Sequence, residues 1–235
     1  MILIHGAWGN AGGWARLVPI LERAGHAVEA MDLPGHGKSG IAPETVGQPE
    51  YVEAALERLR AGPPAMLVGH SMGGIVVAQV ASRAPELVTM AVFVAALLPR
   101  DGESLLDLIR RQDAPGVQAA VRPGPARGTT VLDPAVAAAS LFPDARPADA
   151  ARALAAMGPQ SNKAQTDKAV IGPGFRRVPR AYVLCTEDRV VTPALQRAMI
   201  AATPCEAVFE LECGHVPQLT QPAALASILD GLARA

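Results

Sequence analysis

Aromatic side chains, cysteines and long apolar runs are all scarce in this sequence. Only 3% of the 235 residues are aromatic although 50% are hydrophobic, so a core must be built from Ala, Val, Leu and Ile. Small aliphatic side chains suit a sheet that is covered by helices on both faces. The three cysteines, Cys185, Cys205 and Cys213, lack the spacing of a zinc site or a C-x-x-C pair, and we expect reduced, mostly buried thiols.

An excess of charge of one sign is also absent. The net charge is −1 with both signs interspersed, which gives no field to attract nucleic acid or an anionic membrane. No apolar run reaches the roughly 18 residues that span a bilayer, and residues 1–5 lack the basic region of a signal peptide. We therefore expect a cytoplasmic protein whose partner is a small molecule, not nucleic acid or membrane. A homodimer is an assembly that the sequence leaves open.

Short apolar segments alternate with helical patterns along most of the chain. This alternation favours a single α/β domain with a mostly parallel sheet and helices on both faces. The loops at the carboxyl ends of the strands would then form the site. Strands are expected at residues 1–5, 26–31, 65–69, 87–95, 178–185 and 205–211, and helices at 13–24, 50–60, 72–83, 193–202 and 222–232.

Residues 99–177 interrupt the alternation. They are rich in Ala, Pro, Gly and Asp, with short helical patterns at 103–111 and 148–157. The first of these carries an apolar face of Leu and Ile that needs a packing partner, which favours an inserted cap over a disordered linker. The predicted division is a core of residues 1–98 and 178–235 with a cap at 99–177.

The segment from Ala65 to Gly74 predicts a strand, a sharp turn and a helix, with a G-x-S-x-G pattern at the turn. A serine in a strained conformation at the tip of a strand leaves no room for a side chain two residues away on either side, so Gly69 and Gly73 are required. Ser71 is therefore predicted to be a nucleophile exposed above the sheet. His70 is expected to be a packed structural residue, because its backbone position aims it away from Ser71.

A serine nucleophile needs a base, and the base needs an acid that orients it. His215 lies in the loop between the last expected strand and the last helix, and is the predicted base. Asp188 follows the strand before and is the preferred acid. Glu187 beside it, and Asp101 after the strand that follows the turn, are the alternatives.

Two more loops carry polar residues near the expected site. His5, Gly6 and Ala7 follow the first strand, and a small Gly can bring the next amide close to Ser71. We predict that the N–H groups of Ala7 and Met72 form an oxyanion hole. Residues 32–39 contain Asp, His and Ser, yet their Pro and Gly predict a structural turn in which polar side chains bond the backbone.

These motifs resemble the α/β-hydrolase superfamily, and within it the hydroxynitrile lyase and methyl esterase family with its bacterial esterase relatives. The resemblance lies in residues 5–8, 32–37, 69–74, 91–96 and 185–188, and more loosely in 102–105 and 159–160 of the cap. The lyases characteristically have Thr in place of Gly6 and Lys directly after the catalytic His. This sequence has Gly6 and Val216, so the resemblance implies the esterase branch.

The expected activity is hydrolysis of a small carboxylic ester through an acyl-enzyme on Ser71, without cofactor or metal. A hydroxynitrile lyase-like C–C lyase and a non-catalytic small-ligand-binding protein of the same fold are the alternatives. The expected substrate pocket is lined by apolar side chains: Trp8, Leu105, Leu108, Leu141, Phe142, Met157 and Val216.

Overall fold

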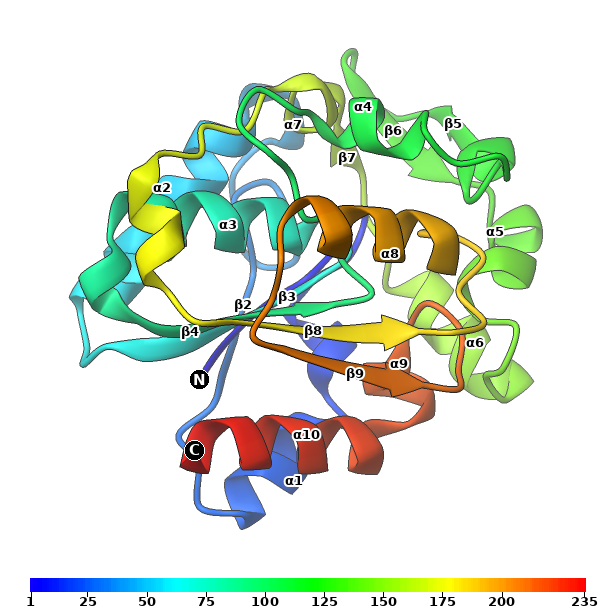
Figure 1. The fold of residues 1–235 in the computed structure, drawn as a ribbon. Coiled ribbons are helices and arrows are strands. Elements are labelled where there is room, and N and C mark those ends of the chain that lie inside the picture. The colour runs from blue at the N-terminus through cyan, green and yellow to red at the C-terminus, as the bar shows by residue number, and fades with distance from the viewer.

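A single sheet of six parallel strands forms the centre of the molecule (Figure 1). The computed structural model describes all residues 1–235. The strand order is β2-β1-β3-β4-β8-β9, and every neighbouring pair is parallel, which confirms the predicted sheet. The strands are β1 (Ile2–Ile4), β2 (Glu29–Met31), β3 (Ala65–His70), β4 (Val88–Val94), β8 (Arg180–Cys185) and β9 (Ala207–Leu211).

Helices cover both faces of this sheet (Figure 1). One face carries α2 (Gln48–Arg60), α3 (Gly73–Arg83) and α8 (Pro193–Ala202), and the other carries α1 (Val18–Arg23) and α10 (Pro222–Arg234). The short elements of the core are η1 (Ala11–Trp14), η2 (Pro43–Thr45), η3 (Pro85–Leu87) and α9 (Pro217–Thr220). The helix expected at 13–24 is instead divided into η1 and α1. Gly12 and Gly13 disfavour a long helix, and Pro19 is suited to the first turn of α1.

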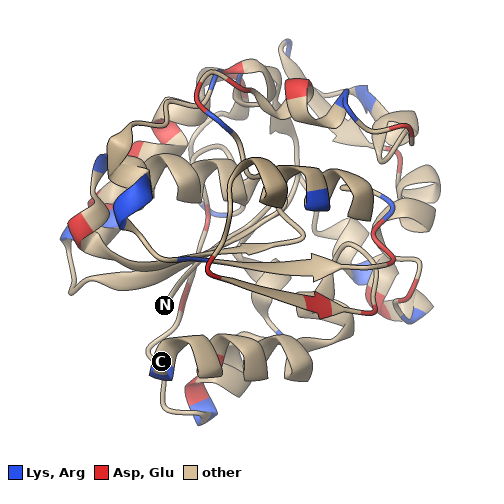
Figure 2. Ribbon diagram, viewed as in Figure 1, with Lys and Arg blue, Asp and Glu red and all other residues tan.

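Alternate residues of each strand enter different halves of the core, as the period of two in a strand requires. In β1, Leu3 packs with Leu21 of α1 and Leu229 of α10, whereas Ile2 and Ile4 belong to the larger cluster on the opposite face. Both faces are thus apolar, which is the pattern of a buried parallel sheet. Lys, Arg, Asp and Glu are interspersed over the outer helices and loops (Figure 2).

Residues 99–177 form mixed structure over the end of the sheet (Figure 1). They contain the expected helical pieces and also a small antiparallel sheet, β5-β6-β7, that the composition did not predict. The elements are α4 (Leu105–Ile109), η4 (Gln118–Ala120), β5 (Val121–Pro123), β6 (Thr129–Leu132), α5 (Pro134–Leu141), α6 (Pro147–Ala155), β7 (Gln160–Ser161), α7 (Asn162–Thr166) and η5 (Pro173–Arg177). The last of these packs back against α3, where Phe175 meets Phe93 of β4.

The longest helices, α2 and α10, have 13 residues each. None of the helices combines the length and the apolar character that crossing a membrane would need.

Candidate active site

Ser71 lies at the turn between β3 and α3 with a φ of 53°, in the left-handed region that non-glycine residues seldom adopt. The turn is held by backbone hydrogen bonds: Ser71 N donates to Val94 O, and Ser71 O accepts from Gly74 N and Leu97 N. A strained residue that its surroundings hold in place is a frequent feature of functional sites.

The glycines around Ser71 are required by close backbone contacts. A Cβ at Gly69 would lie 2.6 Å from Gly73 O, and a Cβ at Gly73 would lie 2.6 Å from Ile4 O. Gly6, in the loop after β1, also has no room, since a Cβ there would lie 2.8 Å from Ser71 Cβ. The steric argument made from the G-x-S-x-G pattern therefore holds in the structure, and it extends to Gly6.

His215 and Asp188 form a buried hydrogen-bonded pair. His215 Nδ1 lies 2.8 Å from Asp188 Oδ2, and the two side chains are 2% and 0% exposed. The other oxygen of Asp188 accepts from the backbone amides of Val190 and Val191, and Oδ2 also accepts from Gln196 Nε2. These bonds fix the carboxylate, which in turn orients the imidazole.

The alternative acids lie elsewhere. Glu187 is exposed, and Asp101 accepts a hydrogen bond from Ile171 N at the surface.

Ser71 and His215 line the same cavity, although no hydrogen bond joins Ser71 Oγ to the imidazole. Such bonds are often long in unliganded sites and shorten when substrate binds.

The backbone amides of Ala7 and Met72 are free donors. Both residues lie outside helices and strands, and neither N–H donates a hydrogen bond within the protein. Met72 is completely buried and Ala7 partly so. A buried N–H without a partner is unusual in a folded protein, so these two amides are available to a ligand.

A network of neutral side chains holds the loop of residues 5–10. Tyr51 of α2 donates to His36 Nε2, and His36 Nδ1 donates to Gly9 O. Gln160 of β7 donates to the Tyr51 hydroxyl, and its Oε1 accepts from Trp8 N. Burial lowers the pKa of His36 to about 3, which keeps its imidazole neutral and able to accept from Tyr51.

His5 and Asp32 complete this support. His5 Nε2 accepts from Leu33 N, so Nδ1 carries the proton that is donated to Gly6 O. Burial lowers the pKa of His5 to about 4. Asp32 accepts from the amides of Ala11 and Lys38. The turn predicted at residues 32–39 is present, and through Asp32 it also braces the loop beside Ser71.

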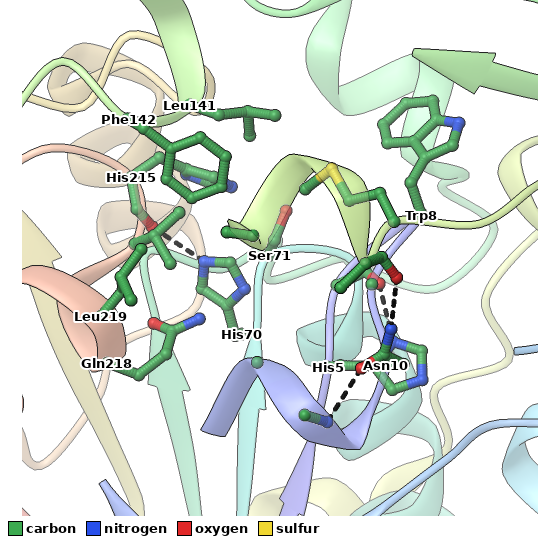
Figure 3. Close-up of a pocket in the computed structure, with 18 of the residues that line it drawn as sticks. His5, Trp8, Asn10, His70, Ser71, Leu141, Phe142, His215, Gln218 and Leu219 are labelled. Carbon is green, nitrogen blue, oxygen red and sulfur yellow. Dashed lines mark hydrogen bonds between the residues drawn. The ribbon is translucent and has the colours of Figure 1, made fainter. Parts of the chain in front are cut away.

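His70 supports the loop that carries His215 from the other side. Its Nε2 donates to His215 O at 2.8 Å, and the two rings lie 4.7 Å apart (Figure 3). Burial, followed by the electrostatic effect of the neighbouring His215 ring, lowers the pKa of His70 well below its usual value. His70 therefore donates as a neutral ring to the backbone of His215.

A cavity of about 350 Å³ opens above Ser71. Of the side chains predicted for its wall, Trp8, Leu141, Phe142, Met157 and Val216 line it. Leu105 and Leu108 do not and correct that expectation, because the apolar face of α4 packs into the core instead. Polar residues that the sequence did not single out also line the cavity: Asn10, Arg16, Asp149, Arg152 and Gln218.

The three thiols are free, with Cys185 and Cys213 buried and Cys205 half-buried. Burial raises the pKa of Cys205 to about 11. No cluster of three His, Cys, Asp or Glu side chains is arranged to hold a metal ion.

A parallel sheet with a strained serine between β3 and α3, and a buried His–Asp pair beyond β9 and β8, defines a protein of the α/β-hydrolase class. The comparison with protein families agrees: residues 1–228 match the model described as the alpha/beta hydrolase family. The chain belongs to this family.

Known relatives align over nearly the whole chain. Methyl jasmonate esterase 1 of Vitis vinifera is 29% identical over 97% of this chain and 94% of its own length. Putative methylesterase 13, chloroplastic, of Arabidopsis thaliana is 28% identical over 97% of this chain, which spans 54% of that protein. The crystal structure of polyneuridine aldehyde esterase has 26% identity and a TM-score of 0.87, covering 99% of this chain and 98% of that chain.

Proposed function

We propose that this protein is a serine carboxylic ester hydrolase that acts on a small ester. The observation that carries the proposal is the strained Ser71 on a cavity that also contains His215, itself bound to the buried Asp188. The similarity to plant methylesterases and to an esterase structure supports an esterase-type hydrolase. The free amides of Ala7 and Met72 supply donors of the kind that acyl transfer needs.

The proposed reaction has two steps. Ser71 Oγ attacks the ester carbonyl while His215 Nε2 accepts its proton, and the Ala7 and Met72 amides stabilise the oxyanion. The tetrahedral intermediate collapses, and His215 returns the proton to the alcohol that leaves. Water, deprotonated by His215, then releases the acid from Ser71. Asp188 holds the proton on Nδ1 and stabilises the imidazolium in both steps.

The experiment is hydrolysis of p-nitrophenyl acetate and butyrate by the wild type and by Ser71→Ala and Asp188→Asn. Loss of the nucleophile should lower kcat by at least about 10³-fold, and Asp188→Asn by about 10⁴-fold, because Asn favours the wrong tautomer of His215. Glu187→Gln is the matched control, since Glu187 is exposed beside the same loop and should retain activity. Circular dichroism establishes that each variant is folded.

A fluorophosphonate probe separates catalysis from ligand binding alone. Efficient labelling of Ser71 in the wild type, with slower labelling of Asp188→Asn, is expected of an activated nucleophile. A folded wild type that neither hydrolyses the esters nor reacts with the probe would contradict the proposal. Release of cyanide from mandelonitrile without ester hydrolysis would contradict it in favour of a lyase.

A further inference from the structure

Gln218 is a buried amide without a partner in the wall of the cavity. It lies on α9, three residues after His215, and is only 4% exposed. Its Oε1 is fully buried without a hydrogen bond, and its Nε2 also makes none. Buried amides are almost always hydrogen-bonded, and one left unpaired costs free energy. Oε1 is enclosed by the protein and Nε2 is not, so the amide is suited to donate from Nε2 to an acceptor group of a ligand in the cavity.

Arginine side chains continue this polar wall. Arg16 Nη1 donates to Leu219 O, next to Gln218, and Arg16 Nη2 lies 2.6 Å from Asp149 Oδ1. Arg152, which also lines the cavity, pairs with the same Asp149 oxygen at 2.5 Å. Gln218, Arg16, Asp149 and Arg152 thus follow one another along one wall, contributed by α9, the turn before α1 and α6 of the cap.

This wall has more positive than negative charge. Arg146 also pairs with Asp149, so three guanidinium groups share one carboxylate, and none of the three pairs with another acid. The Arg146 and Arg152 side chains lower the pKa of Asp149 to about 2, which keeps it ionised. Of these four side chains, Arg16, Arg152 and Asp149 line the cavity, so the formal charge of the lining is +1, and no acidic side chain other than Asp149 lines it.

The other wall is apolar. Figure 3 shows Leu141 and Phe142 above Ser71, and Gln218 below it, next to Leu219 and beyond His70. Val117, Val190 and Val216 also belong to the cavity lining. The cavity therefore offers a substrate at Ser71 both an apolar surface and hydrogen-bond donors with positive charge.

We propose that the substrate is an ester that carries a carboxylate remote from the scissile bond, bound by Arg16, Arg152 and the amide of Gln218. Guanidinium groups bind carboxylates with charge-assisted hydrogen bonds, and the Gln218 Nε2 group adds a neutral donor. This proposal rests on the esterase function proposed above and names the substrate class for that site. The apolar part of the ester would lie against Leu141 and Phe142.

The test compares charged esters with neutral esters of the same shape. Monomethyl succinate, glutarate and adipate place the carboxylate in the acyl part, and the O-acetyl derivatives of ω-hydroxy carboxylic acids place it in the alcohol part. Each is paired with an isostere in which an isopropyl group replaces the carboxylate. The wild type should favour at least one charged ester by about tenfold in kcat/KM, mainly through KM, and added salt should reduce this ratio.

Variants then test whether the polar side chains of the cavity cause the preference for the charged ester. Arg16→Met and Gln218→Met should each lower the charged-to-neutral ratio by about fivefold, and Gln218→Glu should reverse it by repulsion. Arg16→Lys should retain part of it, since the charge remains. Arg197→Met is the matched control, because Arg197 is an exposed, ion-paired arginine on α8 that does not line the cavity, so the ratio should not change.

Binding to Ser71→Ala distinguishes this proposal from the proposed function. Isothermal titration calorimetry should show tighter binding of the preferred charged ester than of its isostere, with or without turnover by the wild type. Equal or weaker binding of all charged esters, or a ratio unchanged in Arg16→Met and Gln218→Met, would overturn the carboxylate site and leave the esterase intact. Absence of hydrolysis with charge-selective binding would instead overturn the esterase.

Discussion

Neighbouring residues leave almost no free space around Ser71 Cβ. Gly6 lies so close that a Cβ would be 2.8 Å from Ser71 Cβ and 3.3 Å from His70 Nδ1. Ser71 Cβ is fixed by a strained backbone and cannot move away cheaply. One added methyl group at residue 6 must therefore displace Ser71 or the loop that carries Ala7.

We expect Gly6→Ala to lower kcat/KM for p-nitrophenyl acetate by about 10²-fold, since a misplacement of about 1 Å can have that effect. The free energy of unfolding should fall by about 1–3 kcal/mol, as is typical of overpacking. Gly62→Ala is the control, because a Cβ at Gly62 meets no atom within 4 Å. If Gly6→Ala retained full activity, the close contact would not constrain the reacting serine.

At the scale of the element, the two-residue strand β7 connects the cap to the loop of residues 5–10. Its Gln160 is completely buried and bonds both Trp8 N and the Tyr51 hydroxyl. Gly158 N also donates to Trp8 O at 2.9 Å. Both the N–H and the C=O of Trp8 are therefore bonded by β7 and the chain just before it. Trp8 has a φ of 58°, and these bonds hold that conformation next to Ala7.

We predict that Gln160→Leu lowers kcat about tenfold and the free energy of unfolding by about 2 kcal/mol, because Trp8 N and Tyr51 lose a partner. Gln79→Leu is the matched control: Gln79 of α3 is also buried and bonds Gln48 and Val170 N away from this loop. It should lower stability by a similar amount but leave kcat close to the wild type. Urea denaturation and steady-state kinetics measure both effects. Equal kcat in the two variants would argue against a positioning role for β7.

The sequence predicts elements well where a local pattern has one physical solution. The apolar strands and the glycines around Ser71 are of this kind, because period-two burial and steric exclusion act over a few residues. Gln160, Tyr51 and Gln218 carry no such local signal, since their roles depend on partners distant in the chain. Leu105 and Leu108 show the same limit: a helical apolar face requires a partner but does not say whether that partner is core or cavity.

At the scale of the whole molecule, three histidines from different segments are buried together near the carboxyl ends of β1 and β3. Burial lowers the pKa of His5 to about 4, that of His36 to about 3, and that of His70 well below 6.5. In the unfolded chain each would titrate near 6.5. Between these values the unfolded chain binds more protons than the folded protein, so acidification favours unfolding.

The stability from these histidines should be fully present above about pH 6.5 and fall as the pH decreases toward 4. The slope is at most about 1.4 kcal/mol per pH unit for each histidine. Urea midpoints measured across this range should therefore fall steadily. His36→Gln can still donate to Gly9 O and accept from Tyr51 but cannot titrate. Its free energy of unfolding should therefore change less steeply with pH, by up to the contribution of one proton. An equal slope in both proteins would show that His36 is not held neutral by the fold, and the neutral network behind Trp8 would lose its basis.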